Sequence, residues 1–494
     1  MIELAQIYTK IQHVNNFSDF NFTQLQLIAY FCRNSKLMYR KLSFLPDEEP
    51  NDLIRRYEAF ISRKTGAGYF DVEEMEQIVD YYLRIGRTKE GKKALEFGFR
   101  LHPGSPGLLT KRAKIYLASD DVQKAFQILS ANVNPHDYEV NLLLIDSLVR
   151  LGRTTEALTM ADNLLGEEVQ ELDAVCLDLA YIFMGNFDID TAYQFITKGI
   201  AFNPLNKDLL FELAFCQEQT GKVSEATTTY NKILKLDPYS AEAWFNMGQM
   251  HYALNEYRLA IDAYEYALVI RPNDSLTVQQ KANCHFQLTE YREAIEEYQL
   301  YSTLAAAPHW QTWLFIGECY ERLEQYNDAI QYYTQSLKEQ PENFEALTGI
   351  AICLMDQDKF EDSLPFIHRA LELQNESAEG WVYLAEALIG TDKVDEALQA
   401  YLHSIRLDPE QPETYMAIGN ICMDREEFKL ALEYYRQALD LDDESDLQNI
   451  HLFMAIAFYK TGFRQEALLS LDKAMDESMD ALKLFREICP ESDF

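Results

Sequence analysis

The sequence predicts an all-α fold assembled from stacked pairs of short helices. Three observations carry this prediction: apolar residues recur at helical spacing in two blocks, the two blocks return about every thirty-four residues, and small residues recur at fixed places in each repeat. The stretch "AWFNMGQMHYALNEYRLAIDAYEYALVIRP", Ala243 to Pro272, contains both blocks. A single amphipathic pair cannot bury its own apolar face, so neighbouring pairs must stack.

Each slot of the repeat has a physical role when Ala241 is counted as position 1. Positions 4, 7 and 11, and then 20, 24 and 27, are apolar, which predicts two amphipathic helices, A and B. Position 24 is aromatic and fills the wedge between neighbouring units, and a proline at position 32 ends helix B. Position 8 holds Gly248, Gly317 and Gly419, and we expect two backbones to approach there, because a glycine inside a helix costs about 1 kcal/mol. Positions 20 and 27 are small for the same reason.

Position 15 lies in the turn between the two helices, where a positive φ is useful. It holds residue types that tolerate this conformation: Gly86, Gly152, Gly221, Gly462, Asn255, Asp358 and Asp392.

This pattern resembles the tetratricopeptide repeat, over roughly residues 72–481 and about twelve helix-turn-helix units. The resemblance implies a right-handed superhelical α-solenoid. The units from Pro106 and Tyr138 are degenerate, since their length is irregular and they lack the final proline. The twelve units begin near Val72, Pro106, Tyr138, Asp173, Lys207, Ala241, Ser275, Trp310, Phe344, Ala378, Pro412 and Gln448.

The ends of such an array need caps, because a stack exposes an apolar face at each end. We predict a capping helix within residues 49–71, the array over 72–477, and a capping helix and tail over 478–494. Residues 1–48 do not match the repeat. They are expected to be a poorly ordered extension, a consequence of an upstream start with Met38 as the native first residue, or a targeting arm.

The charge balance narrows the classes of partner. The chain of 494 residues has a formal net charge of −36, which repels phosphate backbones and anionic lipid headgroups. We therefore expect no nucleic acid and no membrane insertion, and the longest apolar run, Ala346 to Met355, is too short to span a bilayer. The start lacks the pattern of a secretory signal, and the eight cysteines show no CxxC pair, so a cytoplasmic protein is expected.

No catalytic or cofactor motif is present. The sequence lacks a Walker loop, GxSxG, HExxH and GxGxxG, so we expect no enzyme, no cofactor and no metal site. His251 and His285 both occupy position 11 and are expected to be core histidines with satisfied hydrogen bonds. Four cysteines share position 10, where free cysteine acts as a small apolar residue: Cys216, Cys284, Cys319 and Cys353.

The resemblance also implies a concave groove lined by positions 2, 5, 6, 9, 12 and 13 of the A helices. From the unit at Asp173 onward these slots are acidic with interleaved aromatics and amides, whereas Lys111, Lys114 and Arg150 enter them earlier in the chain. One subset of the family clamps acidic C-terminal peptides with lysines, asparagines and an arginine, and that set is not present here: Asn246 occupies one of its positions, but the neighbouring units hold Phe211, Phe215, Leu276 and Gln280 at the others. The candidate peptide-binding residues are Phe211, Glu212, Phe215, Phe245, Asn246, Gln249, Gln280, Asn283, Phe315, Glu318, Tyr383 and Glu386.

These slots favour a non-enzymatic scaffold that binds extended basic or mixed-charge protein segments. One alternative is that the acidic residues only mirror the overall charge and keep the array soluble. Two further alternatives are a structural array that self-associates into homo-oligomers and a regulatory component of an enzyme complex.

Overall fold

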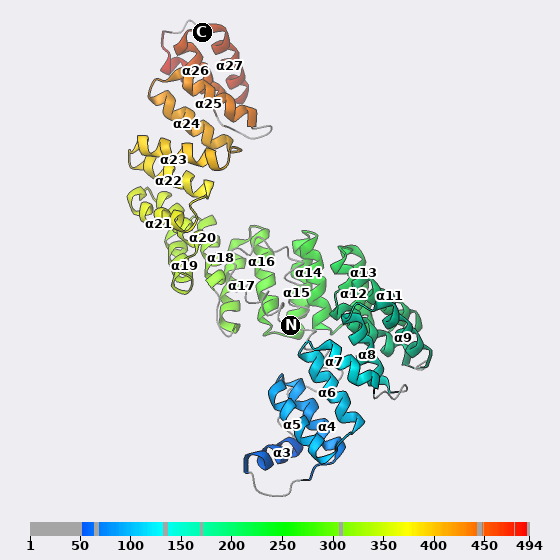
Figure 1. Cartoon of the computed structure of the whole chain (residues 1–494). Helices are drawn as coiled ribbons and strands as arrows, with labels where there is room; N and C mark the ends of the chain where they lie inside the picture. The colour runs from blue at the N-terminus through cyan, green and yellow to red at the C-terminus, as the bar shows by residue number, and fades with distance from the viewer. Residues whose placement is uncertain are drawn as a thin grey trace. The chain divides into compact units, whose positions relative to one another are not determined.

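The computed structural model describes residues 52–63, 69–131, 137–167, 171–305, 310–441, 447, 449–478 and 480–491 (Figure 1). These residues form 26 α-helices, α3 to α28, and contain no strand, so the predicted all-α solenoid of helix pairs is confirmed. The chain divides into two compact units after Ile270, and each unit is described by itself. The expected extension over residues 1–48 lies outside the described residues.

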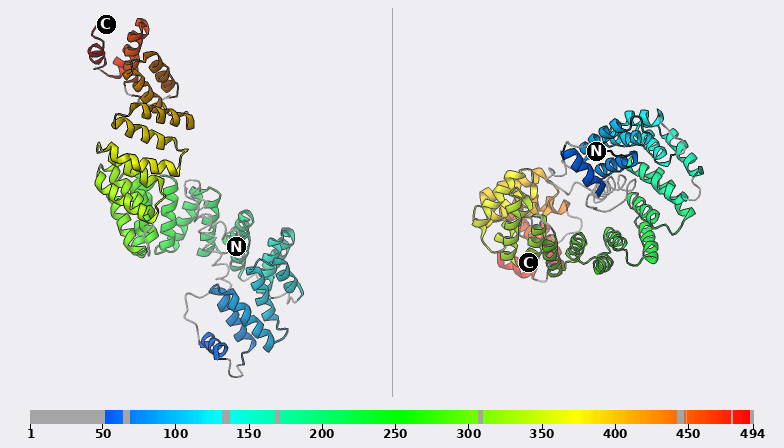
Figure 2. Two further views of the ribbon diagram at one scale, coloured as in Figure 1. Left: turned by 60° about the vertical axis from the view of Figure 1, so that its left-hand side comes forward. Right: turned by 90° about the horizontal axis from the view of Figure 1, so that it is seen from below.

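The N-terminal unit contains thirteen helices that pack in sequence order (Figure 2). They are α3 Asp52–Arg63, α4 Val72–Arg84, α5 Thr88–Leu101, α6 Pro106–Ala118, α7 Val122–Ala131, α8 Tyr138–Arg150, α9 Thr154–Glu167, α10 Leu172–Gly185, α11 Ile189–Phe202, α12 Lys207–Gln219, α13 Val223–Leu236, α14 Ala241–Ala253 and α15 Tyr257–Ile270.

The C-terminal unit repeats the same arrangement. Its helices are α16 Ser275–Gln287, α17 Tyr291–Leu304, α18 Trp310–Arg322, α19 Tyr326–Glu339, α20 Phe344–Met355, α21 Phe360–Leu373, α22 Ala378–Gly390, α23 Val394–Leu407, α24 Pro412–Asp424, α25 Phe428–Leu441, α26 Ile450–Thr461, α27 Arg464–Glu477 and α28 Ala481–Ile488.

The A helices begin where the repeat pattern places them. In ten of the twelve units the first helix starts at the expected residue. In the other two, α10 starts one residue before Asp173 and α26 starts two residues after Gln448. Many of these starts are fixed by a side chain that accepts a hydrogen bond from the amide three residues on; these caps are Asp71, Ser105, Asp137, Asn206, Ser240, Asn343 and Ser377.

The turn at position 15 has a positive φ in all twelve units. The residues expected there adopt it, including Gly86 and Asn255. Five side chains outside that expectation also adopt it. The β-branched Thr289 (φ 59°) is the least suited of them, because its Cβ substituents crowd the backbone in this region. The five are Asp120, Phe187, Thr289, Glu324 and Glu426.

The glycine at position 8 faces a tyrosine ring, and the expectation that two backbones meet there is wrong. A Cβ on Gly248 would lie 2.5 Å from Cε1 of Tyr264, and one on Gly419 would lie 2.5 Å from Cε1 of Tyr435. Each tyrosine occupies position 24 of the same unit. Space for its ring, not backbone approach, therefore explains the glycine.

The wedge role of position 24 is clearest at Tyr333. One edge of its ring lies against Gly317 of its own unit, and the other edge lies against Gly349 of the next unit, at 2.7 and 2.6 Å from the Cβ that either glycine would gain. The ring is therefore held between two consecutive A helices, as the sequence predicts for this slot.

Helices α3 and α28 pack at the ends of the described repeats. Ile54 and Tyr57 of α3 are buried with Phe70 and Ile78. Phe485 of α28 is fully buried with residues of α26 and α27. Both helices thus cover apolar surface of the first and the last described helix pair.

Replacing Thr289 by glycine should stabilise the C-terminal unit. Glycine removes the steric cost of the left-handed backbone, and the greater freedom of the unfolded chain offsets part of the gain, which leaves about 0.5–1 kcal/mol. Urea unfolding followed by circular dichroism measures the change. Asp358→Gly is the matched control at the same slot of the C-terminal unit and should change stability little, because aspartate already tolerates this conformation.

Gly317→Ala should destabilise the C-terminal unit by about 1–2 kcal/mol. The overpacking against Tyr333 outweighs the gain in helix propensity of about 1 kcal/mol. Gly166→Ala is the control, because Gly166 lies inside α9 with no atom within 4 Å of the added Cβ, so propensity alone should raise stability there. A stabilising Gly317→Ala in urea unfolding would show that the ring does not fill this space.

Candidate functional site

The candidate residues of the N-terminal unit lie on α12 and α14. Phe211, Phe245, Asn246 and Gln249 are half-buried. Glu212 and Phe215 are buried, at 8% and 7% exposure, which removes both from any ligand-facing surface. The sequence analysis assigned both residues to the groove only because of their positions in the repeat.

Glu212 is held by the preceding A helix. The hydroxyl of Tyr181 on α10 donates a hydrogen bond of 2.7 Å to Oε1 of Glu212. This buried pair joins α10 to α12 and satisfies the carboxylate, so the residue stabilises the stack.

The tyrosines of position 24 reach from the B helices to the polar residues of the A helices. The hydroxyl of Tyr230 donates to the carboxylate of Glu218, and burial raises the pKa of Glu218 to about 7. The hydroxyl of Tyr298 donates to Oδ1 of Asn283 at 2.7 Å. The acceptor is therefore either the acid at position 12 or the amide at position 9.

The aromatic candidates pack against the same tyrosines. The ring of Phe211 lies 6.2 Å from that of Tyr230, and the ring of Phe245 lies 5.8 Å from that of Tyr264. Phe315 stacks on Tyr298 with centroids 5.7 Å apart. These rings are held in place, and their half-buried faces form fixed apolar surface between the acidic residues.

The C-terminal unit concentrates carboxylates on α18. Burial raises the pKa of Glu318, the neighbouring Glu321 raises it further, and Arg322 opposes the shift from 4.0 Å. Burial also raises the pKa of Glu321, while a hydrogen bond of 2.7 Å from the hydroxyl of Tyr333 lowers it. Asp356 on α20 adds to the repulsion at Glu321. Two carboxylates at this surface thus share one arginine.

Two further candidates come from α22. The hydroxyl of Tyr383 donates to Oε1 of Glu379, and Glu386 is exposed. Glu321 and Asp356 were missing from the candidate list although both occupy its slots. The signal that could have added Glu321 is its spacing of twelve residues from Tyr333, which repeats the spacing of Glu218 from Tyr230.

The lysines that enter the groove slots of the N-terminal unit are neutralised. Lys111 and Lys114 are buried, and the Nζ of Lys111 lies 2.7 Å from Oδ2 of Asp80 and 3.5 Å from Oε2 of Glu139. Lys114 pairs with Glu139 and lies 3.7 Å from Oδ1 of Asp80. Two lysines and two carboxylates therefore join α4, α6 and α8 as a closed ionic cluster.

The two histidines at position 11 are satisfied, as the sequence predicts. Nδ1 of His251 lies 2.6 Å from Oε2 of Glu256, and Nδ1 of His285 lies 2.8 Å from Oε2 of Glu290. Each pair spans the turn from helix A to helix B. In the described part of the chain no three potential ligands gather to hold a metal ion.

The position-10 cysteines are buried, which fits their predicted role as small core residues. Burial raises the pKa of the Cys216, Cys284 and Cys319 thiols to about 12, so their reactive thiolate form is scarce near neutral pH.

Comparison with known families agrees with the repeat. Residues 208–240 and 241–274 each match a family model described as Tetratricopeptide repeat. The chain is a tetratricopeptide repeat protein. Residues 273–484 match the model of the Cilia and flagella-associated protein 70 C-terminal domain.

Curated relatives share parts of the array. Human protein O-mannosyl-transferase TMTC1 is 27% identical over 181 residues, which cover 35% of this chain and 20% of that protein. Tetratricopeptide repeat protein 34 of Xenopus laevis is 28% identical over 142 residues, 28% of this chain and 25% of that protein. The matched segments therefore span only a fifth to a quarter of these relatives.

Two solved structures align with the chain at TM-scores below 0.5. A chain of the APC/C hetero-tetramer Cut9-Hcn1 aligns with a TM-score of 0.41 at 14% identity, over 88% of this chain and 98% of that chain. YrrB, titled a TPR protein with an unusual peptide-binding site, aligns with a TM-score of 0.34 at 16% identity, over 38% of this chain and 96% of that chain. Across the described residues, no helix has the length and apolar character needed to cross a membrane.

The ionic cluster generates a prediction about stability. Burial opposes ionisation of Glu139, but Lys114 and Lys111 lower its pKa below the usual value. Glu139→Gln should therefore lower the unfolding free energy by about 3 kcal/mol at pH 7, because both buried lysines then keep only Asp80 as an ion-pair partner within 4 Å, with Glu76 acting on Lys111 from farther away. The pKa of Glu139 is lower in the folded protein than in the unfolded chain, where it is near 4.5. The stability that ionised Glu139 contributes is therefore fully present above pH 4.5, and it is lost as the pH falls through the pKa of the folded state.

Urea unfolding of the wild type and Glu139→Gln between pH 7 and pH 3.5 checks this. The two stabilities should converge in acid. Glu156→Gln is the control for loss of a surface carboxylate, because Glu156 pairs with Arg153 on an exposed face, and it should cost under about 1 kcal/mol. Equal losses from both variants would refute a structural role for the cluster.

Proposed function

We propose that this protein is a non-enzymatic scaffold whose A-helix faces bind extended protein segments rich in lysine or arginine. The observation that carries the proposal is the carboxylate surface of α18, α20 and α22. Glu318 and Glu321 are partly desolvated, repel one another and have Arg322 as the cation beside them. A cationic ligand side chain would relieve that repulsion in a setting of low dielectric, where the attraction is stronger than in water.

The fixed aromatic rings supply the second half of the recognition. Phe315 and Tyr383 flank the carboxylates in the C-terminal unit, and Phe211 and Phe245 provide apolar surface on α12 and α14 of the N-terminal unit. Rigid aromatic anchors lose little conformational entropy on binding, and neighbouring charges set specificity. We infer a ligand with basic residues separated by apolar ones, which is consistent with a mixed-charge segment.

The ionic cluster of α4, α6 and α8 argues against a ligand at these three helices. Lys111 and Lys114 already occupy the acceptors Asp80 and Glu139. A ligand lysine would have to displace a buried ammonium group, which costs several kcal/mol. We therefore propose that binding is confined to the A helices after α10.

The comparisons suggest where to seek the partner. The matched family model covers residues 273–484 and is named for a protein of cilia and flagella, so we propose a ciliary or flagellar partner as the first to test. The likeness to an O-mannosyl-transferase lies in a segment that makes up 20% of that enzyme. Because no catalytic motif occurs in the sequence, we attribute that likeness to the shared repeats, and we place the chain in the cytoplasm or its ciliary extension.

The proposal predicts the effect of neutralising one carboxylate on α18 and one on α22. Glu318→Gln combined with Glu386→Gln should weaken binding of a fluorescein-labelled peptide with alternating Lys and Leu about tenfold, measured by fluorescence polarisation at 0.1 M salt. Binding should also weaken as pH falls through the raised pKa values of Glu318 and Glu321, because protonation removes the charges that attract the peptide.

The control is Glu361→Gln with Glu372→Gln, which removes two exposed carboxylates from the B helix α21. This variant should bind as the wild type does. Equal weakening by both variants would mean that overall charge, and not the A-helix face, attracts the peptide. Glu212 is unsuitable for such a test, because its substitution breaks the buried pair with Tyr181.

Self-association is the competing proposal. Light scattering coupled to size-exclusion chromatography, over a hundredfold range of protein concentration, separates the two. A monomer that binds the basic peptide favours the scaffold. Dimers that disappear when the peptide is added would place self-association on the same A-helix face.

A further inference from the structure

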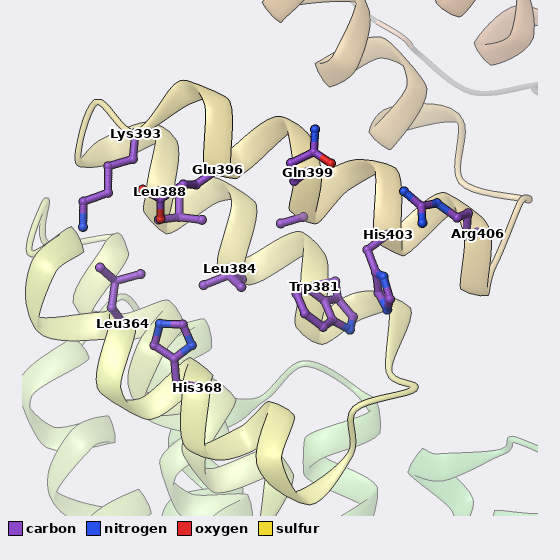
Figure 3. A pocket seen from close by; sticks show the side chains of 11 residues that line it. Leu364, His368, Trp381, Leu384, Leu388, Lys393, Glu396, Gln399, His403 and Arg406 are labelled. Atoms are coloured by element: carbon purple, nitrogen blue, oxygen red, sulfur yellow. The ribbon is translucent and has the colours of Figure 1, made fainter.

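The C-terminal unit carries a hollow, formed by helices α21, α22 and α23 with the turn before α23 and shown in Figure 3. It encloses about 460 Å³. Its lining comes from positions 4, 7 and 11 of the A helix α22 and from the B helices, so it shares no residue with the proposed basic-segment site. Its lining includes the apolar Trp381, Leu384 and Leu388, the imidazoles of His368 and His403, and the charged Lys393, Glu396 and Arg406.

The charge of this hollow is opposite to that of the chain. The whole sequence has 80 acidic against 44 basic residues, yet the lining has Lys393, Arg406 and two imidazoles against the single carboxylate of Glu396. Lys393 and Arg406 are exposed, and neither makes an ion pair within the described part of the chain. Nε of Arg406 donates to the carbonyl of Leu402 at 3.1 Å, which orients the guanidinium and leaves its other donors for a ligand.

The floor between the two cations is apolar and rigid. Leu384 and Leu388 are buried at 6% and 5% exposure. The indole of Trp381 is fixed by a hydrogen bond of 2.9 Å from Nε1 to the carbonyl of Asn375 and by the ring of His403 at 4.3 Å. A ligand side chain can therefore bury apolar surface on preformed walls.

The spacing of the cations sets the shape of the ligand. Lys393 directly precedes α23 and Arg406 lies in its last turn, thirteen residues later. At 1.5 Å per residue this places their backbones about 20 Å apart. An extended chain advances about 3.3 Å per residue, so two ligand carboxylates that meet both cations lie about six residues apart.

We propose that this hollow binds an extended acidic protein segment, in which two Asp or Glu residues about six positions apart flank apolar side chains. The charge complementarity of an isolated cationic surface on an acidic protein, together with the fixed indole floor, selects this partner over a basic one. The site would act beside the proposed basic-segment surface and does not depend on it.

The test uses the full chain and a labelled seven-residue peptide with Glu at both ends and Leu, Ala and Phe between them. Fluorescence polarisation should show saturable binding that weakens with added salt. Lys393→Gln and Arg406→Gln should each reduce affinity about fivefold, and Glu396→Gln should increase it about twofold because the lining carboxylate repels the ligand. The same peptide with Gln ends should bind at least tenfold more weakly.

Two controls keep the outcome specific. Lys429→Gln removes an exposed charge from α25, outside the hollow, and should leave affinity unchanged, as should Glu318→Gln at the basic-segment surface. The proposal is overturned if the Gln-ended peptide binds equally well or if Lys429→Gln has the effect of Lys393→Gln. It is also overturned if a labelled oligonucleotide, and not the acidic peptide, binds in a manner that needs Lys393 and Arg406.

Discussion

The burial of the side chain at position 24 is the interaction on which the repeats depend, and six of the twelve units supply a tyrosine there. A pair of helices of thirteen and fourteen residues cannot bury its apolar face alone, so each unit must present a shape that the next can fill. Tyr333 does this by lying between Gly317 and Gly349. The glycines are costly in a helix but allow the ring to approach, and the burial of so large a side chain outweighs that cost.

The same tyrosine shapes the chemistry of the A-helix face. A buried tyrosine hydroxyl favours an acceptor, and the hydroxyls of Tyr230, Tyr333, Tyr298 and Tyr435 donate to Glu218, Glu321, Asn283 and Asn420 respectively. A requirement of the core thus places acids and amides at the edge of the surface on which a ligand would lie. Part of the acidic character of the A-helix face therefore has a structural origin. Glu318 differs, because this half-buried carboxylate accepts no hydrogen bond from a tyrosine among the described residues and lies beside Arg322.

The position of a residue within the repeat predicted the helix bounds well, because every repeat unit has the same spacing of apolar residues, turn residues and helix ends. It also predicted the left-handed turn, although Phe187 and Thr289 show that register can impose this backbone on unsuitable residues. Side-chain exposure was less predictable. Glu212 and Lys111 occupy groove slots, yet both are buried because a neighbouring unit supplies Tyr181 or Asp80. Each of these pairs joins residues about one repeat apart. Whether the pair forms depends on the residues of both repeat units, so it cannot be predicted from the position of one residue within its own repeat.

As proposed, the two surfaces of the C-terminal unit would exclude each other's ligands. A basic segment that approaches Lys393 and Arg406 meets like charge, and an acidic segment that approaches Glu318 and Glu321 does the same. Each surface gains specificity from this repulsion at no cost to the core, because Arg406 and Lys393 lie on exposed positions of a B helix and its preceding turn. A stacked array can therefore separate two binding preferences by helix, with A helices selecting cations and B helices selecting anions.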